Sequence, residues 1–243
     1  MRLALLGHGR MGQLVRTLAL EEGHEVALVL TSRAASLSLE ELAEALRGHD
    51  AAIDFSLPAA VLRNIEACVR ARVPLVEGTT GWNKDEAEAR RIVEREGGAL
   101  IYGANFSIGV NLFYRIAAYA AELFRATCDY APFIEEAHHA RKLDAPSGTA
   151  LRLRELLNAR LSTNIPIAST RAGFIPGTHL VGFDSPADQI TLTHTARSRA
   201  GFARGALLAA RWIVGREGVY EFSEMIDELV KDIETMKGEN DAG

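Results

Sequence analysis

Residues 135–150, EEAHHARKLDAPSGTA, hold the densest group of side chains that could do chemistry. Two adjacent histidines, His138 and His139, are followed closely by Lys142. Imidazole and ammonium groups can give or take a proton at a reacting centre, and histidine does so near neutral pH. The stretch therefore predicts a site of proton transfer.

An anion site is predicted directly after this cluster. Ser147, Gly148 and Thr149 lie where the next helical pattern begins. The first turn of a helix offers free backbone N–H groups and the positive end of the helix dipole, which bind a carboxylate or phosphate. A proton donor beside such a clamp suits a small acidic substrate. A basic loop that ends in a good N-cap is the alternative, and the complete cluster favours a site.

The other histidines are expected to be structural. His8 lines a loop, and His179 and His194 fall in strand patterns. No metal site is expected at His138 and His139, because adjacent strand residues face opposite sides and no Cys, Asp or Glu partner has metal-ligand spacing.

The first hundred residues, which must help position these groups, alternate between two periodicities. Strands are predicted at 3–6, 24–30, 51–55, 74–77 and 99–102. Helices are predicted at 13–22, 38–47, 58–72 and 83–96. Strands that alternate with helices at short spacing indicate right-handed crossovers and a doubly wound parallel sheet.

A GxGxxG motif lies between the first predicted strand and helix. Its residues are Gly7, His8, Gly9, Arg10, Met11 and Gly12. In a dinucleotide fingerprint the three glycines allow a tight turn, close approach of pyrophosphate, and close packing of helix on sheet. The position favours cofactor binding over the alternative of an unrelated ligand at the switch point.

The residues after the second strand bear on the choice of cofactor. A carboxylate there would accept hydrogen bonds from the ribose of NAD, but the chain has Ser32 and Arg33. Arg33 could pair with a 2′-phosphate, or it could be a solvated loop residue. We expect NADPH to be accepted at least as well as NADH.

Two further segments follow the fourth and fifth strands, at the sheet edge where ligands bind. They comprise Gly78, Thr79 and Thr80, and Gly103, Ala104, Asn105 and Phe106. Each could be a simple turn, but the shared edge favours contacts with the nicotinamide side of the cofactor.

The second half changes character after a helix predicted at 108–126. Strands are predicted at 130–136, 165–172, 178–183 and 189–196, with one helix at 149–161, followed by helices at 203–214 and 222–236. This succession predicts an α+β domain with an open mixed sheet. We therefore expect a dinucleotide-binding domain of residues 1–107 with 203–243, and a second domain of residues 108–202.

Composition agrees with an ordinary globular enzyme. The net charge of -5 argues against nucleic-acid binding. The longest late apolar run, ALLAARWIVG, is too short to span a membrane. Cys68 and Cys128 lack paired spacing and are expected to be core residues in a reducing compartment, which predicts a cytoplasmic protein.

The motifs resemble the 4-hydroxy-tetrahydrodipicolinate reductase (dihydrodipicolinate reductase) family of bacterial lysine and diaminopimelate synthesis. The resemblance rests on GRMG, IDFS, GTTG, ANFSIGVN and EEAHHARKLDAPSGTA, and continues through RAGFIPGTHLVGF, HTARSRAGFARGA and GVYEFSEM. It implies a Rossmann-like domain, a sheet-rich substrate and tetramerisation domain, and a homotetramer.

The resemblance also implies roles for individual residues. His138 is the implied acid/base and Lys142 a second proton donor. His139, Lys142, Ser147, Gly148 and Thr149 are the implied carboxylate contacts. The implied reaction transfers hydride from the nicotinamide to a cyclic imine-like dicarboxylate, with loss of the 4-hydroxyl as water.

Three features depart from the family pattern. The fingerprint is one residue shorter than the commoner GxxGRMG form, the stretch from Arg33 to Asp50 is short, and Ser32 replaces a frequent acid. They bear on cofactor preference. Two rival functions also fit the cofactor half of the chain, an amino-acid or aldose dehydrogenase and a non-catalytic redox sensor, but neither explains the His138, Lys142 and PSGT cluster.

Overall fold

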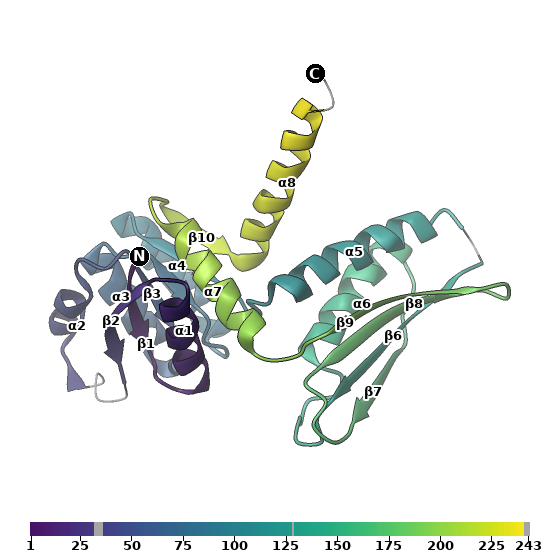
Figure 1. The fold of residues 1–243 in the computed structure, drawn as a ribbon, viewed down its shortest axis with the longest axis horizontal. Helices are drawn as coiled ribbons and strands as arrows, with labels where there is room; N and C mark the ends of the chain where they lie inside the picture. Colours follow the sequence, from purple (N-terminus) through teal and green to yellow (C-terminus); the bar gives the residue numbers. More distant parts are fainter. Residues whose placement is uncertain (32–35, 128, 241–243) are drawn as a thin grey trace. The chain divides into compact units, whose positions relative to one another are not determined.

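The chain divides into two compact units (Figure 1). The structure is a computed structural model that describes residues 1–31, 36–127 and 129–240, with side chains through Asp232. Unit 1 comprises residues 1–107 and 199–243, and unit 2 comprises residues 108–198. The second boundary lies four residues before the predicted 202/203, because helix α7 (Ala200–Ile213) begins at Ala200 and belongs wholly to unit 1.

Unit 1 contains a six-stranded parallel sheet. Its strands are, in order across the sheet, β2 (Glu25–Leu30), β1 (Arg2–Leu6), β3 (Ala51–Asp54), β4 (Leu75–Glu77), β5 (Ala99–Tyr102) and β10 (Gly218–Glu221). The central strands are almost wholly buried, as expected for a sheet covered on both faces. The strand order reverses direction between β1 and β3, which creates a switch point where loops diverge and a ligand can bind.

Helices cover both faces of this sheet. Helices α1 (Arg10–Glu21) and α7 pack on each other and on the strands. A second group, α2 (Leu39–Leu46), α3 (Val61–Ala71) and α4 (Glu86–Glu96), packs against the strands in one apolar core. The 3₁₀ turns η2 (Pro58–Ala60) and η3 (Asn83–Asp85) lead into α3 and α4, and α8 (Phe222–Asn240) follows β10. The predicted doubly wound sheet is confirmed.

Strand β10 was not predicted from the sequence. Its four residues, GVYE, run directly into helix α8 without an intervening turn, and helix α7 precedes them, so the local pattern did not separate a strand from the helices. Pairing rather than local propensity produces it: its residues lie in parallel register with Ala99–Tyr102 of β5, and Gly218 N donates to Gly98 O at 2.8 Å.

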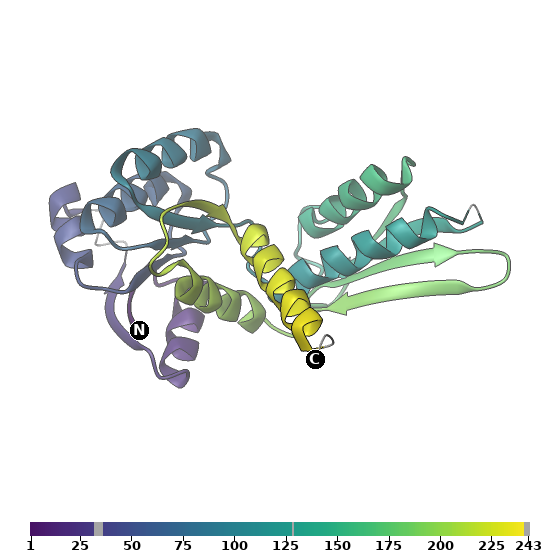
Figure 2. The same ribbon diagram turned by 90° about the horizontal axis from the view of Figure 1, so that it is seen from above.

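Unit 2 contains a four-stranded mixed sheet. Its strands are, in order, β7 (Ile167–Arg171), β6 (Ala131–His138), β8 (Thr178–Asp184) and β9 (Gln189–Thr195). Strands β6 and β7 are parallel, with α6 (Gly148–Leu161) as their crossover, and the other pairs are antiparallel. Helices α5 (Ile108–Phe124) and α6 lie side by side over one face of the sheet (Figures 1 and 2). The mixed sheet predicted for this unit is confirmed.

Two smaller predictions concern cysteines and membranes. Cys68 is a buried free thiol in the core of unit 1, as predicted, whereas Cys128 lies outside the described residues. Among the helices that the structure describes, none is long and apolar enough to cross a membrane.

Candidate active site

The site is built at the carboxyl end of β6 in unit 2. Alternation along the strand puts Ile134, Glu136 and His138 on one face, and all three are buried. Ile134 belongs to the apolar core under the helices. The strand runs two residues beyond its predicted end, so His138 is its last residue and Glu136 lies directly behind it.

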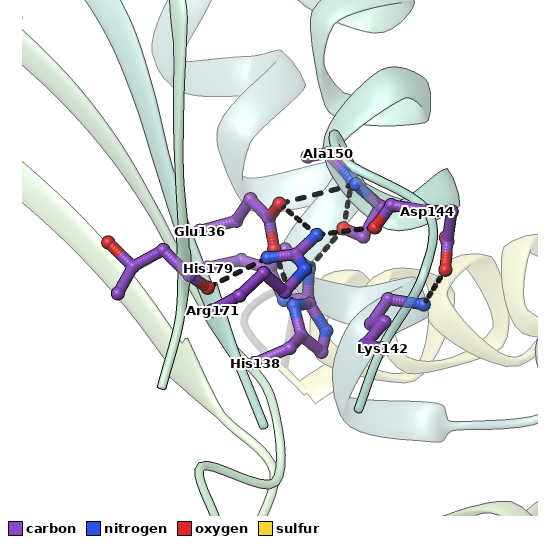
Figure 3. A network of polar contacts seen from close by, with 9 residues as sticks. Glu136, His138, Lys142, Asp144, Ala150, Arg171 and His179 are labelled. Carbon is purple, nitrogen blue, oxygen red and sulfur yellow. Dashed lines mark hydrogen bonds and ion pairs between the residues drawn. The ribbon is translucent and has the colours of Figure 1, made fainter. Parts of the chain in front are cut away.

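Glu136 is the centre of a polar network (Figure 3). Its side chain is fully buried, and it accepts a hydrogen bond from Arg171 Nη2 at 2.7 Å and one from the backbone N of Ser147 at 3.3 Å. Its other oxygen is hydrogen-bonded to His138 Nδ1. Although burial opposes ionisation, the hydrogen bonds from Arg171, Ser169 and His138 lower the pKa of Glu136 to about 2. Glu136 is therefore an anion at neutral pH.

Burial and neighbouring charges act on the pKa of His138 in opposite directions. Burial lowers its pKa below the ordinary 6.5, the Glu136 carboxylate raises it, and the cations of Lys142 and Arg171 lower it again. The net direction is downward, so the ring is mainly neutral at neutral pH without a ligand. An anionic ligand beside it would shift this balance towards the protonated ring.

Lys142 reaches the same region from the loop after β6. Its Nζ lies 2.8 Å from Asp144 Oδ1, and this ion pair lowers the pKa of Asp144. Arg171 Nη2 also donates to the backbone oxygen of Asp144 at 2.6 Å. Lys142 thus holds the side chain of Asp144 and Arg171 holds its backbone oxygen, and these two contacts fix the loop between β6 and α6.

The predicted anion clamp lies at the start of α6. Ser147 is the N-cap, and its Oγ accepts from Ala150 N at 3.3 Å. Gly148 is exposed, and a side chain there would meet no protein atom within 4 Å. Thr149 is half-buried, and its hydroxyl is hydrogen-bonded to Tyr114 of α5. His139 is half-buried on the strand side opposite to His138, and its buried Nδ1 has no hydrogen-bond partner among the described residues.

Three residues of the network were not among the predicted site residues: Glu136, Arg171 and His179. The strand register opposes Glu136 to His179 on β8 and His138 to Arg171 on β7. The His138 and His179 rings are 5.1 Å apart, and His179 Nε2 lies 3.1 Å from Ser147 Oγ. Burial, followed by the nearby His138, lowers the pKa of His179 to about 4. The expectation that His179 is only a structural histidine is therefore incomplete, because it contacts the N-cap of the clamp.

The same residues could in principle hold a metal ion. Ligand atoms of Glu136, His138 and His179 lie within 4.8 Å of one another. However, Glu136 is already paired with Arg171 and bound to His138, and a guanidinium beside the carboxylate repels a second cation. The geometry favours a hydrogen-bond network over a metal centre.

The GHGRMG segment in unit 1 has the geometry of a dinucleotide fingerprint. Gly7 has φ +94°, and a side chain there would lie 2.5 Å from Phe55 O. A side chain at Gly12 would lie 2.1 Å from Gly7 O, so only glycine lets α1 approach β1 this closely. Gly9 has open space around it and caps α1 without a side-chain hydrogen bond. The free N–H groups of α1 fit a pyrophosphate.

The remaining fingerprint residues, His8, Arg10 and Met11, lie around this open helix start, with His8 and Arg10 exposed. Ser32 and Arg33, which were predicted to contact the adenosine end of a cofactor, lie outside the described residues. Strand β2 is one of the two outer strands of the described sheet, the other being β10.

The segments after β4 and β5 lie at the same edge of the sheet. Thr79 is held on three sides: its N donates to Glu77 Oε1 at 2.7 Å, its hydroxyl accepts from Ser56 N at 3.2 Å, and its O accepts from Trp82 Nε1 at 2.9 Å. Gly78 cannot carry a side chain, which would lie 2.2 Å from the Phe55 ring. Thr80 is exposed at the edge.

The segment after β5, Gly103 to Phe106, was also predicted to contact the cofactor. Ala104 is exposed, and Asn105 Oδ1 accepts from Ser107 N at 2.8 Å. The Phe106 side chain is buried and packs on Phe55 and Phe222 with ring centroids 6.3 and 4.7 Å apart. Ala104 is thus the exposed residue of the segment, Gly103 is half-buried against Phe222, and the Phe106 ring belongs to the core.

Comparisons with known proteins identify the family of the chain. Family models described as "Dihydrodipicolinate reductase, N-terminus" and "Dihydrodipicolinate reductase, C-terminus" match residues 1–106 and 109–226. A 4-hydroxy-tetrahydrodipicolinate reductase of Christiangramia forsetii is 39% identical over 95% of this chain and 100% of its own length. The chain belongs to the dihydrodipicolinate reductase family.

Solved structures of relatives show the same fold. A dipicolinate-bound dihydrodipicolinate reductase from Paenisporosarcina sp. TG-14 has a TM-score of 0.75 and 22% identity, with coverage of 91% of this chain and 97% of that chain. A probable dehydrogenase from Thermotoga maritima has a TM-score of 0.60 and 10% identity, with 93% of each chain covered.

Proposed function

We propose that this member of the family reduces 4-hydroxy-tetrahydrodipicolinate with a pyridine nucleotide, in lysine and diaminopimelate biosynthesis. The observation that carries the proposal is the placement of His138 and Lys142 beside the open start of α6, in a chain 39% identical to a named reductase. A dehydrogenase with a different substrate or a redox sensor would not need this combination of proton donors and anion clamp.

The residues of unit 2 would divide the work as follows. Lys142 and the first N–H groups of α6 bind the substrate carboxylates, with His139, Ser147, Gly148 and Thr149 around them. The negative charge of the bound dicarboxylate raises the pKa of His138, which then donates a proton to the reduced ring. Lys142 is the second candidate donor. The bound nicotinamide supplies the hydride.

The residues of unit 1 would hold the cofactor. The backbone around Gly9 and the start of α1 bind the pyrophosphate, while Gly78 to Thr80 and Gly103 to Asn105 line the nicotinamide side. NADPH is proposed to serve at least as well as NADH, because Ser32 brings no negative charge and Arg33 can pair with a 2′-phosphate.

The test is NADPH oxidation by the purified protein with freshly generated substrate. His138→Gln and Lys142→Met should each lower kcat by about 10²-fold or more, because each removes a proton donor. NADPH affinity, measured by fluorescence titration without substrate, should barely change. Arg141→Met is the matched control, since it removes an exposed cation next to Lys142.

Two outcomes would contradict the proposal. Wild-type protein that binds NADPH but fails to oxidise it with this substrate would exclude the reaction. Turnover near the wild-type value in His138→Gln or Lys142→Met would exclude the corresponding donor. We further propose a cytoplasmic homotetramer, as the family resemblance implies, and light scattering of the purified protein would test its mass.

A further inference from the structure

Glu136 is a buried carboxylate that the proposed chemistry does not use directly. Its side chain has no exposed surface, and it is hydrogen-bonded by Arg171, Ser169, the Ser147 backbone and the His138 ring. Burying an anion is costly unless it is paired and hydrogen-bonded. Glu136 is therefore a buried anion that is costly to maintain, and it lies on the same strand face as the proposed acid, His138.

We propose that Glu136 is a positioning residue for His138: its carboxylate accepts the Nδ1–H and so leaves Nε2 as the nitrogen that exchanges a proton with the substrate. The inference rests on the proposed function and deepens it. In a histidine the bond made by one ring nitrogen determines the protonation of the other. Because Glu136 is ionised, it can only accept, so Nδ1 must carry the hydrogen.

Arg171 makes this arrangement stable. Its guanidinium bonds the Glu136 oxygen that does not face His138, so the carboxylate bridges a cation and the imidazole. The strand register fixes both contacts, because Arg171 is opposite His138 on the parallel neighbour β7. Glu136 thus keeps its charge without giving up its bond to the ring.

The other side of the ring is kept open by Gly177. A side chain at Gly177 would lie 3.2 Å from His138 Nε2, and the residue has φ +138°, which L side chains rarely adopt. The Glu136 carboxylate occupies Nδ1, and the absence of a side chain at Gly177 leaves room beside Nε2, so Nε2 is the nitrogen that a substrate can reach. This second observation is independent of the hydrogen bond to Glu136.

The charges that face His138 set the expected effect of removing Glu136. They are Glu136 on its own strand, Lys142 on the following loop, Arg171 on β7 and His179 on β8. Only Glu136 favours the protonated ring. In Glu136→Gln one carboxylate oxygen becomes an NH2 group, so a single oxygen cannot accept from both His138 Nδ1 and the Arg171 and Ser147 donors. The negative charge is also lost, and the pKa of His138 falls.

The decisive measurement is the pH dependence of kcat/KM for wild type, Glu136→Gln and Glu135→Gln. Reduction needs protonated His138, so activity declines as pH rises through its pKa in the free enzyme. In Glu136→Gln this decline should shift to lower pH, and kcat/KM above the pKa should fall by about tenfold or more. Glu135→Gln is the control, because Glu135 is the exposed neighbour on the opposite strand face.

A ring-nitrogen NMR spectrum of the wild-type protein gives a second readout that needs no variant at Glu136. The His138 signals, assigned by their loss in His138→Gln, should show the Nδ1–H tautomer at high pH. An Nε2–H tautomer would overturn the positioning role, as would an unmoved pH profile in active Glu136→Gln. A fall in kcat/KM of Glu136→Gln that is equal at every pH, or that comes only from a higher KM, would also overturn the positioning role. Absence of wild-type turnover would instead count against the proposed reaction.

Discussion

Thr149 belongs to the proposed substrate clamp and also contacts helix α5. Its hydroxyl is hydrogen-bonded to Tyr114, a largely buried phenol on α5 whose pKa is raised by burial. Thr149→Val should raise KM for the substrate, because the hydroxyl is a proposed carboxylate contact, and should leave cofactor affinity unchanged. Inhibition by pyridine-2,6-dicarboxylate, a planar dicarboxylate, should weaken in parallel.

Tyr114→Phe separates the two roles of Thr149. It removes the partner hydroxyl while the Thr149 hydroxyl stays in place. If Tyr114→Phe raised KM and weakened the inhibitor as much as Thr149→Val, the effect would come from α5 packing and not from contact with a ligand.

Arg33 is the residue on which cofactor choice is expected to depend. An ionic pair with a 2′-phosphate should make Arg33→Ala lower NADPH affinity by about 1–3 kcal/mol and leave NADH nearly untouched. Fluorescence titrations with both cofactors measure the two effects. Equal effects on NADPH and NADH would show that Arg33 does not contact the phosphate.

The sequence predicted the site residues that lie close together in the chain and missed those that strand pairing brings in. His138, Lys142 and Ser147 fall in one short segment, so their types and spacing indicated chemistry. Arg171 and His179 lie 24 and 32 residues beyond Ser147, and only the register of β6 with β7 and β8 brings them to the site. Glu136 had a usable signal, since alternation in a strand places it on the His138 face.

At the scale of elements, β3 and β4 end in a pair of buried carboxyls, Asp54 and Glu77. Asp54 accepts from Ser56 N at 2.7 Å and Asn64 Nδ2 at 2.6 Å, and Glu77 accepts from Thr79 N. Burial, followed by the negative charge of Asp54, raises the pKa of Glu77 well above its ordinary value. We therefore expect Glu77 to keep its proton and to share it with Asp54, which would tie the ends of β3 and β4 together at the cofactor edge.

Glu77→Gln should therefore stabilise unit 1 increasingly as pH rises. A carboxyl whose folded pKa is raised is fully stabilising below its unfolded pKa, near 4.5, and loses that contribution as pH rises through the folded value. The amide keeps the donor to Asp54 and cannot ionise. Urea unfolding at pH 6 and pH 9 should show a gap between variant and wild type that widens with pH.

Glu77→Leu and Glu94→Gln complete the comparison. Leucine leaves Thr79 N without its acceptor and removes the carboxyl group beside Asp54, so it should cost about 1–3 kcal/mol. Glu94 is exposed on α4, so its replacement by Gln should leave the pH dependence unchanged. A gap between Glu77→Gln and wild type that stays constant with pH would argue against the shared proton.

Element type was predictable wherever the pattern was long enough. The alternation of apolar runs with capped helices predicted five strands of the parallel sheet, and Ser38 with Glu41 forms the capping box that begins α2. Gly218–Glu221 was not predicted, because it runs directly into helix α8 and is recognisable as a strand only by its pairing with β5. Pairing between strands that are far apart in the sequence cannot be predicted from the local pattern of apolar and polar residues.

At the scale of the whole molecule, the buried polar network of unit 2 determines the response to acid. His179 has its pKa lowered to about 4 from the ordinary 6.5, so the neutral ring is stabilising above pH 6.5, and that contribution is lost as pH falls through this window. The shift corresponds to about 3 kcal/mol. His179→Gln should therefore unfold in urea with less pH dependence between pH 6.5 and 4 than wild type.

Glu136 acts in a lower pH window. Its pKa of about 2 means that its stabilising contribution is present above the ordinary 4.5 and is lost as pH falls from there towards 2. His179→Gln should keep this second loss. His8→Gln, at an exposed position in unit 1, is the control for removing a histidine elsewhere, and a pH response identical to wild type in His179→Gln would refute the assignment.

The pairing of β10 with β5 also has a consequence for synthesis on the ribosome. Strands β1 to β5 emerge first, but the partner of β5 begins at Gly218, after all of unit 2 has been made. At about 5–20 residues per second, the nascent sheet waits on the order of ten seconds with its β5 edge unpaired. Unit 2, whose strands are continuous in sequence, can close during that interval. The nascent chain is thus most exposed to edge-to-edge association, and most in need of a chaperone, while its second half is being translated.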